Sequence, residues 1–155
     1  LWQRLTMKVL KSSSWKEKEI YTFLNSTVIP MRVAANFDGC PLICSIWFKF
    51  KEEAQMIIGA TQDSSRLAQI LKEVPRCAFE ISTNNTPYRG VRGQATVALS
   101  KDNAEDALQE LIDRYLGKTN TELANWLINR SDKEVMIELK PEWISSWDYS
   151  SRMSF

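Results

Sequence analysis

The residues best suited to chemistry lie in the tract 57–71, where a predicted strand leads into a predicted helix. The start of a helix presents free backbone N–H groups and the positive end of the helix dipole, and both attract an anion. Thr61, Ser64 and Ser65 add hydroxyl donors to this junction. Arg66 adds a forked guanidinium whose geometry suits a phosphate group. The tract is therefore a candidate anion-binding site.

Ordinary helix capping explains the same residues. Asp63 and Ser64 are both common N-cap types, and Arg66 would then point into solvent. The Asp63 carboxylate also disfavours a bound phosphate. A capped helix start still has unused N–H groups, so capping and anion binding are compatible. The residues alone leave both interpretations open.

Two further stretches carry polar groups on predicted strands. Arg32 lies on the side of the strand 28–37 that faces away from the core, where a plain surface arginine is the alternative interpretation. In the stretch 87–94, two arginines and Gln94 fall on or near one strand face. Gly90 and Gly93 lack side chains, which lets a flat ring or another backbone approach. A bend in a barrel strand with solvated arginines explains the same pattern.

The tail from Trp143 to Trp147 is a fourth candidate. Large aromatic side chains close to a chain end dock onto the core, cover a partner subunit or cover a flat ligand. The sequence has six tryptophans, which indicates a large buried seam or an interface, and the choice among these stays open.

The composition excludes several classes of chemistry. Histidine is absent, which removes the usual general base, the commonest metal ligand and every histidine-dependent triad. Cys40, Cys44 and Cys77 lack metal-site spacing and are expected to be small buried hydrophobic residues in a reducing cytoplasm. No metal site, no carboxylate pair and no phosphate-binding P-loop pattern is predicted, and no catalytic acid, base or nucleophile is assigned.

The charge and hydropathy exclude other partners. A net charge of +1, from 20 basic and 19 acidic residues, exerts no long-range attraction on nucleic acid or anionic membranes. No apolar run approaches the length of about 18 residues that a transmembrane helix needs. Leu1–Leu10 lacks the apolar region of a signal peptide. We therefore expect no nucleic acid and no membrane as partners.

The hydrophobic periodicity predicts strands that alternate with helices. Predicted strands cover residues 28–37, 42–50, 55–61, 77–82, 89–99 and 134–139, with Pro141 interrupting the last before a final segment 143–148. Predicted helices cover residues 12–25, 64–74, 102–116 and 120–129, with Ser14 and Asp102 as N-caps and Gly117 after a C-terminus. Asp38-Gly39 predicts a hairpin turn. Short turns make the first three strands antiparallel.

These elements predict an α+β fold with a six-stranded antiparallel split β-barrel and peripheral helices. The 155 residues suit a single domain over residues 1–155, in which residues 1–27 form a helical lead-in. The order of motifs resembles the FMN-binding split-barrel superfamily, whose members include the pyridoxamine 5'-phosphate oxidase-like flavoproteins. The stretches that carry the resemblance are Arg32–Asn36, Ile46–Phe48, Thr61–Arg66, Tyr88–Ala95 and Ser146–Asp148.

The resemblance implies a homodimer that holds FMN at its interface. Matched residue by residue, it implies that the phosphate is held by Arg32, Thr61, Ser65 and Arg66. It implies that the flavin is flanked by Val33, Ala34, Ala35 and Ala60. Gln94 and Trp147 would reach a flavin across the interface.

The sequence departs from the family at three points. Leu67 stands where the family has a lysine after Ser-Arg, and Phe37 stands where pyridoxamine-phosphate oxidases have a lysine. The Arg-x-His pair of those oxidases has no counterpart in a chain without histidine. From the resemblance we expect a flavin-dependent oxidoreductase with a small-molecule substrate. Because of these departures, we expect that the protein is not a true pyridoxamine-phosphate oxidase. The alternatives are a non-catalytic module that binds or stores a flavin or deazaflavin, and a cofactor-free split barrel that acts as an interaction domain.

Overall fold

The computed structural model of the protein describes residues 7–153. This part of the chain is α+β, with all seven strands in one antiparallel sheet. The strands are β1 (Met31–Phe37), β2 (Cys40–Ile46), β3 (Lys49–Lys51), β4 (Met56–Gln62), β5 (Arg76–Ser82), β6 (Arg89–Ser100) and β7 (Glu134–Asp148). The helices are α1 (Glu17–Ser26), α2 (Arg66–Glu73), α3 (Ala104–Tyr115), α4 (Thr121–Ile128), the 3₁₀ turn η1 (Ser131–Lys133) and α5 (Ser150–Met153).

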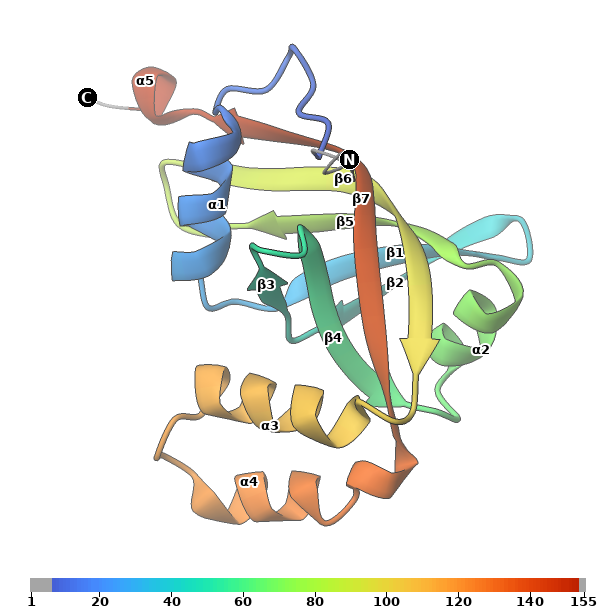
Figure 1. The fold of residues 1–155 in the computed structure, drawn as a ribbon. Helices are drawn as coiled ribbons and strands as arrows, with labels where there is room; N and C mark the ends of the chain where they lie inside the picture. The colour runs from blue at the N-terminus through green and yellow to red at the C-terminus, as the bar shows by residue number, and fades with distance from the viewer. Residues whose placement is uncertain (1–6, 154–155) are drawn as a thin grey trace, which may run out of the picture.

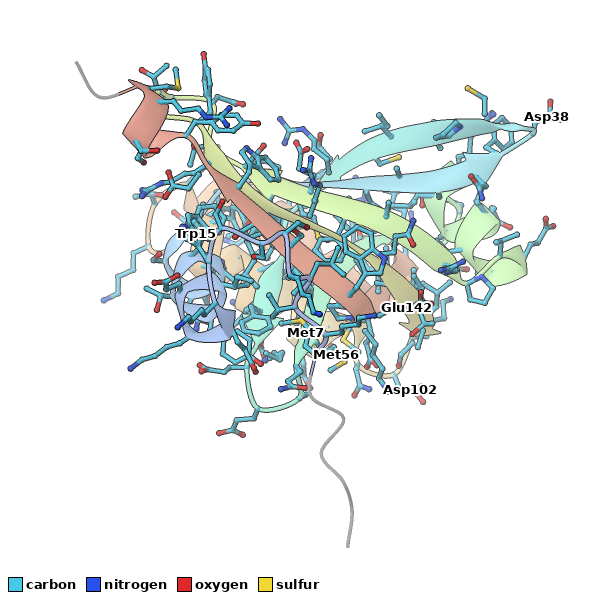
Figure 2. All side chains as sticks on the ribbon, turned by 90° about the horizontal axis from the view of Figure 1, so that it is seen from above. Met7, Trp15, Asp38, Met56, Asp102 and Glu142 are labelled. Atoms are coloured by element: carbon cyan, nitrogen blue, oxygen red, sulfur yellow. The ribbon has the colours of Figure 1, made fainter. Side chains whose placement is uncertain are left out.

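The sheet curls into a barrel that stays open between its two edge strands. Its strand order is β2-β1-β5-β6-β7-β4-β3, and the long strands β6 and β7 form its centre (Figure 1). The helices α3 and α4 lie together beside β4, whereas α2 lies near the β1–β2 hairpin (Figure 1). That hairpin projects from the body, with Asp38 at its tip (Figure 2). Asp38 and Gly39 both have positive φ, which confirms the predicted turn.

The prediction of one strand over residues 42–50 is wrong, and this accounts for the seventh strand. Residues 40–46 pair with β1, whereas residues 49–51 pair with β4, so the chain changes partners at Trp47 and Phe48. Tyr115 of α3 fixes this corner, because its hydroxyl donates to the Ile29 carbonyl at 2.7 Å and accepts from the Phe48 N–H at 3.0 Å. The Trp47 ring stacks on the Tyr115 ring at 4.9 Å.

The predicted break at Pro141 is also wrong, because β7 continues through it as a β-bulge. Gln94 pairs with Trp143 and Ala95 pairs with Pro141, so Glu142 has no partner on β6. A bulge absorbs one extra residue and redirects its side chain. The strand therefore bends at this point without ending.

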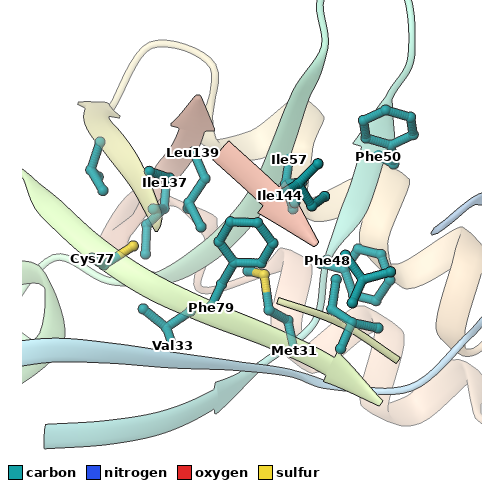
Figure 3. Packing of buried hydrophobic residues seen from close by; sticks show 14 of the residues in the cluster. Met31, Val33, Phe48, Phe50, Ile57, Cys77, Phe79, Ile137, Leu139 and Ile144 are labelled. Carbon is teal, nitrogen blue, oxygen red and sulfur yellow. The ribbon is translucent and has the colours of Figure 1, made fainter. Parts of the chain in front are cut away.

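Alternating apolar residues of the strands and one face of α2 fill the barrel. Met31, Val33 and Phe79 meet Ile137 and Leu139 in this core (Figure 3). The helix α2 adds an apolar face that consists of Leu67, Ala68, Ile70 and Leu71. The periodicity predicts Leu67, Ile70, Leu71 and Val74 for this face, and it is wrong for Val74, which is exposed after the end of the helix. Full burial of a large apolar side chain stabilises the fold by about 1.5–3 kcal/mol, so α2 is firmly anchored to the barrel.

The predicted helix over residues 12–25 begins later than expected. Ser14 is not its cap, because the Ser14 N–H donates to the Ser146 carbonyl of β7. The helix α1 begins at Glu17, and the Lys16 N–H donates to the Glu19 carboxylate at 3.1 Å. Residues 8–14 instead line the free edge of β7, and the first six residues of the predicted lead-in lie outside the described residues.

Smaller corrections concern strand and helix ends. The first strand begins at Met31, not at Val28, and the N-cap of α3 is Asn103, not Asp102. Gly117 has the positive φ expected after a helix C-terminus. Among residues 7–153, no helix has both the length and the apolar composition needed to cross a membrane.

The cysteines differ in their surroundings. Cys77 is buried, and its burial raises the pKa of the thiol to about 12. Cys44 is half-buried and Cys40 is exposed, so the expectation that all three are buried is confirmed for Cys77, holds only in part for Cys44 and is wrong for Cys40. All three are free thiols.

Candidate functional site

The outer face of the sheet carries a row of small residues between two large ones. Cross-strand pairing places Ile43 of β2, Ala34 of β1, Ala78 of β5, Gln94 of β6 and Trp143 of β7 side by side. Two neighbouring alanines leave a flat floor, and Ile43 and Trp143 stand at its two sides. A groove of about 470 Å³ lies over this floor. We call it the outer groove.

A charged row borders the outer groove. Arg32, Glu80 and Arg92 are cross-strand neighbours on β1, β5 and β6, yet neither arginine forms an ion pair with a carboxylate within residues 7–153. Arg32 donates to the Pro30 carbonyl at 3.1 Å. The Arg92 guanidinium lies 4.8 Å from the centre of the Trp147 ring. Both positive charges therefore remain available to a ligand in the groove.

A second polar group lies where β4 passes into α2. The Thr61 hydroxyl donates to the Ser65 hydroxyl oxygen at 3.1 Å, and Ser65 accepts from the Ala68 N–H at 3.1 Å. The N-cap is therefore Ser65, and the prediction of Asp63 or Ser64 as the N-cap is wrong. The Arg66 guanidinium lies 4.7 Å from the centre of the Phe37 ring. We call Thr61, Ser65 and Arg66 the helix-start cluster.

Asp63 does not oppose an anion at the helix-start cluster as strongly as its position in the sequence implied. Lys72 binds its carboxylate at 2.7 Å, and Lys101 lies 3.9 Å away. The hydrogen bond from Lys72 holds the pKa of Asp63 below its usual range. The carboxylate is therefore ionised and already neutralised by neighbouring lysines.

Within one chain, the outer groove and the helix-start cluster face different ways. Arg32 lies on the outer face of β1, whereas Phe37, which Arg66 covers, has the opposite parity on the same strand. The five-residue offset from Arg32 to Phe37 corresponds to roughly 17 Å along a strand. The structure therefore does not bring Arg32 together with Thr61, Ser65 and Arg66 in a single chain.

The other predicted residues divide between core and surface. The side chains of Val33 and Ala35 are buried, while that of Ala34 lines the outer groove. Ala60 is half-buried on β4. Trp147 lies on the outer face beyond the groove, where it covers Gly90 so closely that a Cβ there would lie 2.7 Å from its ring.

Sequence reasoning missed several residues of the outer groove. Ile43 and Ala78 carried no chemical signal, and Trp143 was singled out only as part of the tail. Strand alternation places a residue on one face of a sheet but does not tell which residue on another strand lies next to it. Only the observed register joins these residues into one floor.

A second hollow, the lateral cleft, has a volume of about 670 Å³ between β3, β4 and α3. Glu110 of α3 binds both Lys49, at 3.4 Å, and Lys51. Burial opposes the ionisation of Glu110, but the two lysines outweigh it and hold the pKa of Glu110 below its usual range. The two lysines of this cleft are thus paired with Glu110, whereas the other lining carboxylates, Glu52, Glu53 and Asp106, form no ion pair within residues 7–153.

Comparisons with known proteins support the fold. No family model matches the chain, and no curated protein matches it. A crystal structure of a conserved hypothetical protein from Mycobacterium tuberculosis is 22% identical, with a TM-score of 0.75 over 92% of this chain and 91% of the other. The chain has the split-barrel fold. The resemblance predicted from the sequence is thereby confirmed for the architecture.

Two further split barrels illustrate the range of relatives. An F420 reductase is 20% identical, with a TM-score of 0.64 over 79% of this chain and 93% of the other. A putative pyridoxamine 5'-phosphate oxidase from Listeria innocua is 12% identical, with a TM-score of 0.63 over 86% and 98% of the two chains. At these identities the shared property is the fold, so the function has to be argued from the residues of this chain.

Proposed function

We propose that the protein is an FMN-binding homodimer that serves as an oxidoreductase for a small substrate. The outer groove carries this proposal, because its flat alanine floor, flanked by arginines and by Gln94, fits a planar heteroaromatic ring with polar edges. Its volume of about 470 Å³ falls within the range of small-molecule sites, roughly 300–1,000 Å³. The split-barrel relatives that act on flavin-like cofactors support the same assignment.

Each FMN would lie between two copies of the chain. The helix-start cluster supplies two hydroxyl groups and a guanidinium, which together suit a phosphate. Because this cluster and the outer groove face different ways in one chain, a ligand that touches both requires the cluster of one copy and the groove of the other. Arg32 would then meet the cofactor from the groove side.

Exposed apolar side chains beside the outer groove and beside α2 support a second copy. Ile43 is 67% exposed at the side of the groove, and Phe37 and Val74 are also exposed near the β1–β2 hairpin. None of the tryptophans within residues 7–153 is fully buried, so they do not form the buried seam that was one interpretation of their number. An interface is the natural place for such aromatic side chains.

The residues of the groove would bind and orient the cofactor. FMN, when bound, supplies hydride or electron transfer. Arg32 and Arg92 would attract an electron-rich ring, and Glu80 is the one carboxylate among the residues that line the groove. This shortage of acid and base groups favours, as a second candidate, a module that binds or stores a flavin or deazaflavin without turnover. The exposed thiol of Cys40 fits a reducing compartment such as the cytoplasm.

A titration with FMN tests the proposal. The purified protein is mixed with FMN, and binding is followed by quenching of flavin fluorescence while sedimentation gives the oligomeric state. We expect a dimer that binds one FMN per chain. A dimer without flavin affinity would contradict the proposal and favour a cofactor-free interaction domain. Reduction of bound FMN by NADH or NADPH, coupled to turnover, separates the oxidoreductase from the binding module.

A further inference from the structure

Gln94 stands in the row that forms the floor of the outer groove, and its side-chain oxygen is already occupied. The indole N–H of Trp143 donates to Gln94 Oε1 at 3.1 Å. The Arg76 guanidinium donates to the same oxygen at 3.5 Å. Both groups are donors only, so the amide cannot turn over without placing its own NH₂ group against two other donors.

The Arg76 guanidinium is itself held in place. Its Nε and one terminal nitrogen bind the two oxygens of Glu142 at 3.1 and 2.7 Å. The hydrogen bond that Arg76 donates to Glu142 raises the pKa of Arg76 further, so this residue stays charged. Glu142 is the unpaired residue of the β7 bulge, and bulges often redirect a side chain beside a site.

We propose that Trp143 and the Arg76–Glu142 pair are positioning residues that hold Gln94 as a hydrogen-bond donor toward the ligand. Gln94 Nε2 makes no hydrogen bond within residues 7–153, so both of its hydrogens are available. The groove thus selects a planar ligand that presents an acceptor edge, a ring carbonyl or an unprotonated ring nitrogen, to Gln94. This inference rests on the proposed function for the identity of the ligand. The hydrogen bonds from Trp143 and Arg76 that fix the Gln94 amide, which we call the Gln94 lock, are present in the protein without a ligand.

The lock is tested first without any cofactor. Each tryptophan indole N–H gives a separate proton NMR signal, and Trp143→Phe identifies the signal of Trp143. We expect Gln94→Ala to shift that signal upfield and to speed its exchange with solvent, because its acceptor is lost. Gln109→Ala, on the surface of α3 where Gln109 binds Asp113, is the matched control and should leave it unchanged. If the chemical shift and exchange rate of the Trp143 indole proton are unchanged in Gln94→Ala, the proposed hydrogen bond between Trp143 and Gln94 is wrong.

The donor role is tested by FMN affinity. Gln94→Glu keeps the shape and the bonds from Trp143 and Arg76 but removes both N–H donors, and we expect the FMN dissociation constant to rise at least fivefold, the worth of about one hydrogen bond. Trp143→Phe keeps an aromatic ring but removes the indole N–H donor, which lets the Gln94 amide turn. We expect the FMN dissociation constant to rise about threefold, together with a shifted flavin absorption band. Wild-type affinity in Gln94→Glu overturns the donor role. Failure of the wild-type protein to bind FMN contradicts the proposed function instead, and the indole signal then still decides on the lock.

Discussion

The outer groove and the lateral cleft are two hollows of the same protein that differ in whether their positively charged side chains form ion pairs. The lateral cleft is the larger, about 670 Å³ against about 470 Å³. Its lysines are bound to Glu110, whereas Arg32 and Arg92 of the outer groove form no ion pair within residues 7–153. In the cleft, the carboxylate of Glu110 on α3 neutralises the two lysines. The groove lies on a bare sheet face with cationic groups available.

This difference teaches that the size of a hollow does not make it a binding site. A carboxylate that sits between two lysines would have to lose those contacts before an anion could replace it. In the outer groove, a ligand can contact the flat floor and the N–H groups of the Gln94 amide without first breaking an ion pair. The two hollows should therefore respond differently to matched substitutions.

Filling the floor of the groove should have the largest effect. Ala78→Leu places a branched side chain where a ring would lie, and overpacking of this kind costs roughly 1–3 kcal/mol. We expect the FMN dissociation constant to rise about a hundredfold while thermal unfolding changes little, because Ala78 faces outward. Ala54→Leu at the rim of the lateral cleft is the control. Equal losses in both variants would erase the distinction between the hollows.

Removing the guanidinium of the helix-start cluster should have the next largest effect. Arg66→Ala removes a charge-assisted hydrogen bond to phosphate, worth roughly 1.5–3 kcal/mol, so FMN affinity should fall about thirtyfold. Riboflavin, which lacks the phosphate, should bind both proteins alike in the same fluorescence titration. Lys51→Ala in the lateral cleft should leave FMN affinity unchanged. An Arg66→Ala variant with unaltered preference for FMN over riboflavin would remove this residue from the phosphate site.

A charge at the side of the groove should weaken the dimer. Ile43→Glu puts a carboxylate on a side chain that is 67% exposed in one chain and that we expect the second copy to cover. The dimer dissociation constant, measured by sedimentation, should rise about tenfold, since burial of an unpaired charge is unfavourable. Trp126→Glu on α4, where Trp126 is 53% exposed, is the control. A dimer insensitive to Ile43→Glu would place the interface elsewhere.

The lateral cleft should yield the smallest effect, and only on stability. Because the folded-state pKa of Glu110 lies below its unfolded value, its ion pairs stabilise the protein above the unfolded pKa, and this contribution is lost as the pH falls through the folded pKa. Glu110→Gln should lower the free energy of unfolding at pH 7 by less than about 1 kcal/mol, since the pair is partly exposed. Urea unfolding should show the difference shrinking below about pH 4, with FMN affinity unaffected at neutral pH.

Local sequence signals predicted the helix-start cluster well. The strand before Thr61, the capping hydroxyl groups and the apolar face of α2 all lie within one short tract, and such neighbours are fixed by helix geometry. The turn at Asp38-Gly39 was predictable for the same reason. The N-cap was predicted as Asp63 or Ser64 and is Ser65, because Asp and Ser are equally good cap types and the composition of this stretch does not tell which of the three residues begins the helix.

The outer groove could not be predicted as a unit. Ala34 and Trp143 are more than a hundred residues apart, and only the sheet register makes them part of one row. The change of strand partner at Trp47 depends on Tyr115 of a distant helix. Pro141 was interpreted as a break because a proline lacks the N–H that a strand needs, but a bulge accommodates it.

The central claim is that each FMN site combines the helix-start cluster of one copy with the outer groove of the other, and subunit complementation tests it most directly. Arg66→Ala and Ala78→Leu proteins are mixed under conditions that exchange subunits. In a mixed dimer, one site then has both parts intact, and the other site has lost both. Titration with FMN should recover wild-type affinity at about a quarter of all sites, as expected for random pairing in a symmetric dimer. Exchange of subunits without any recovered high-affinity site would contradict the shared-site account.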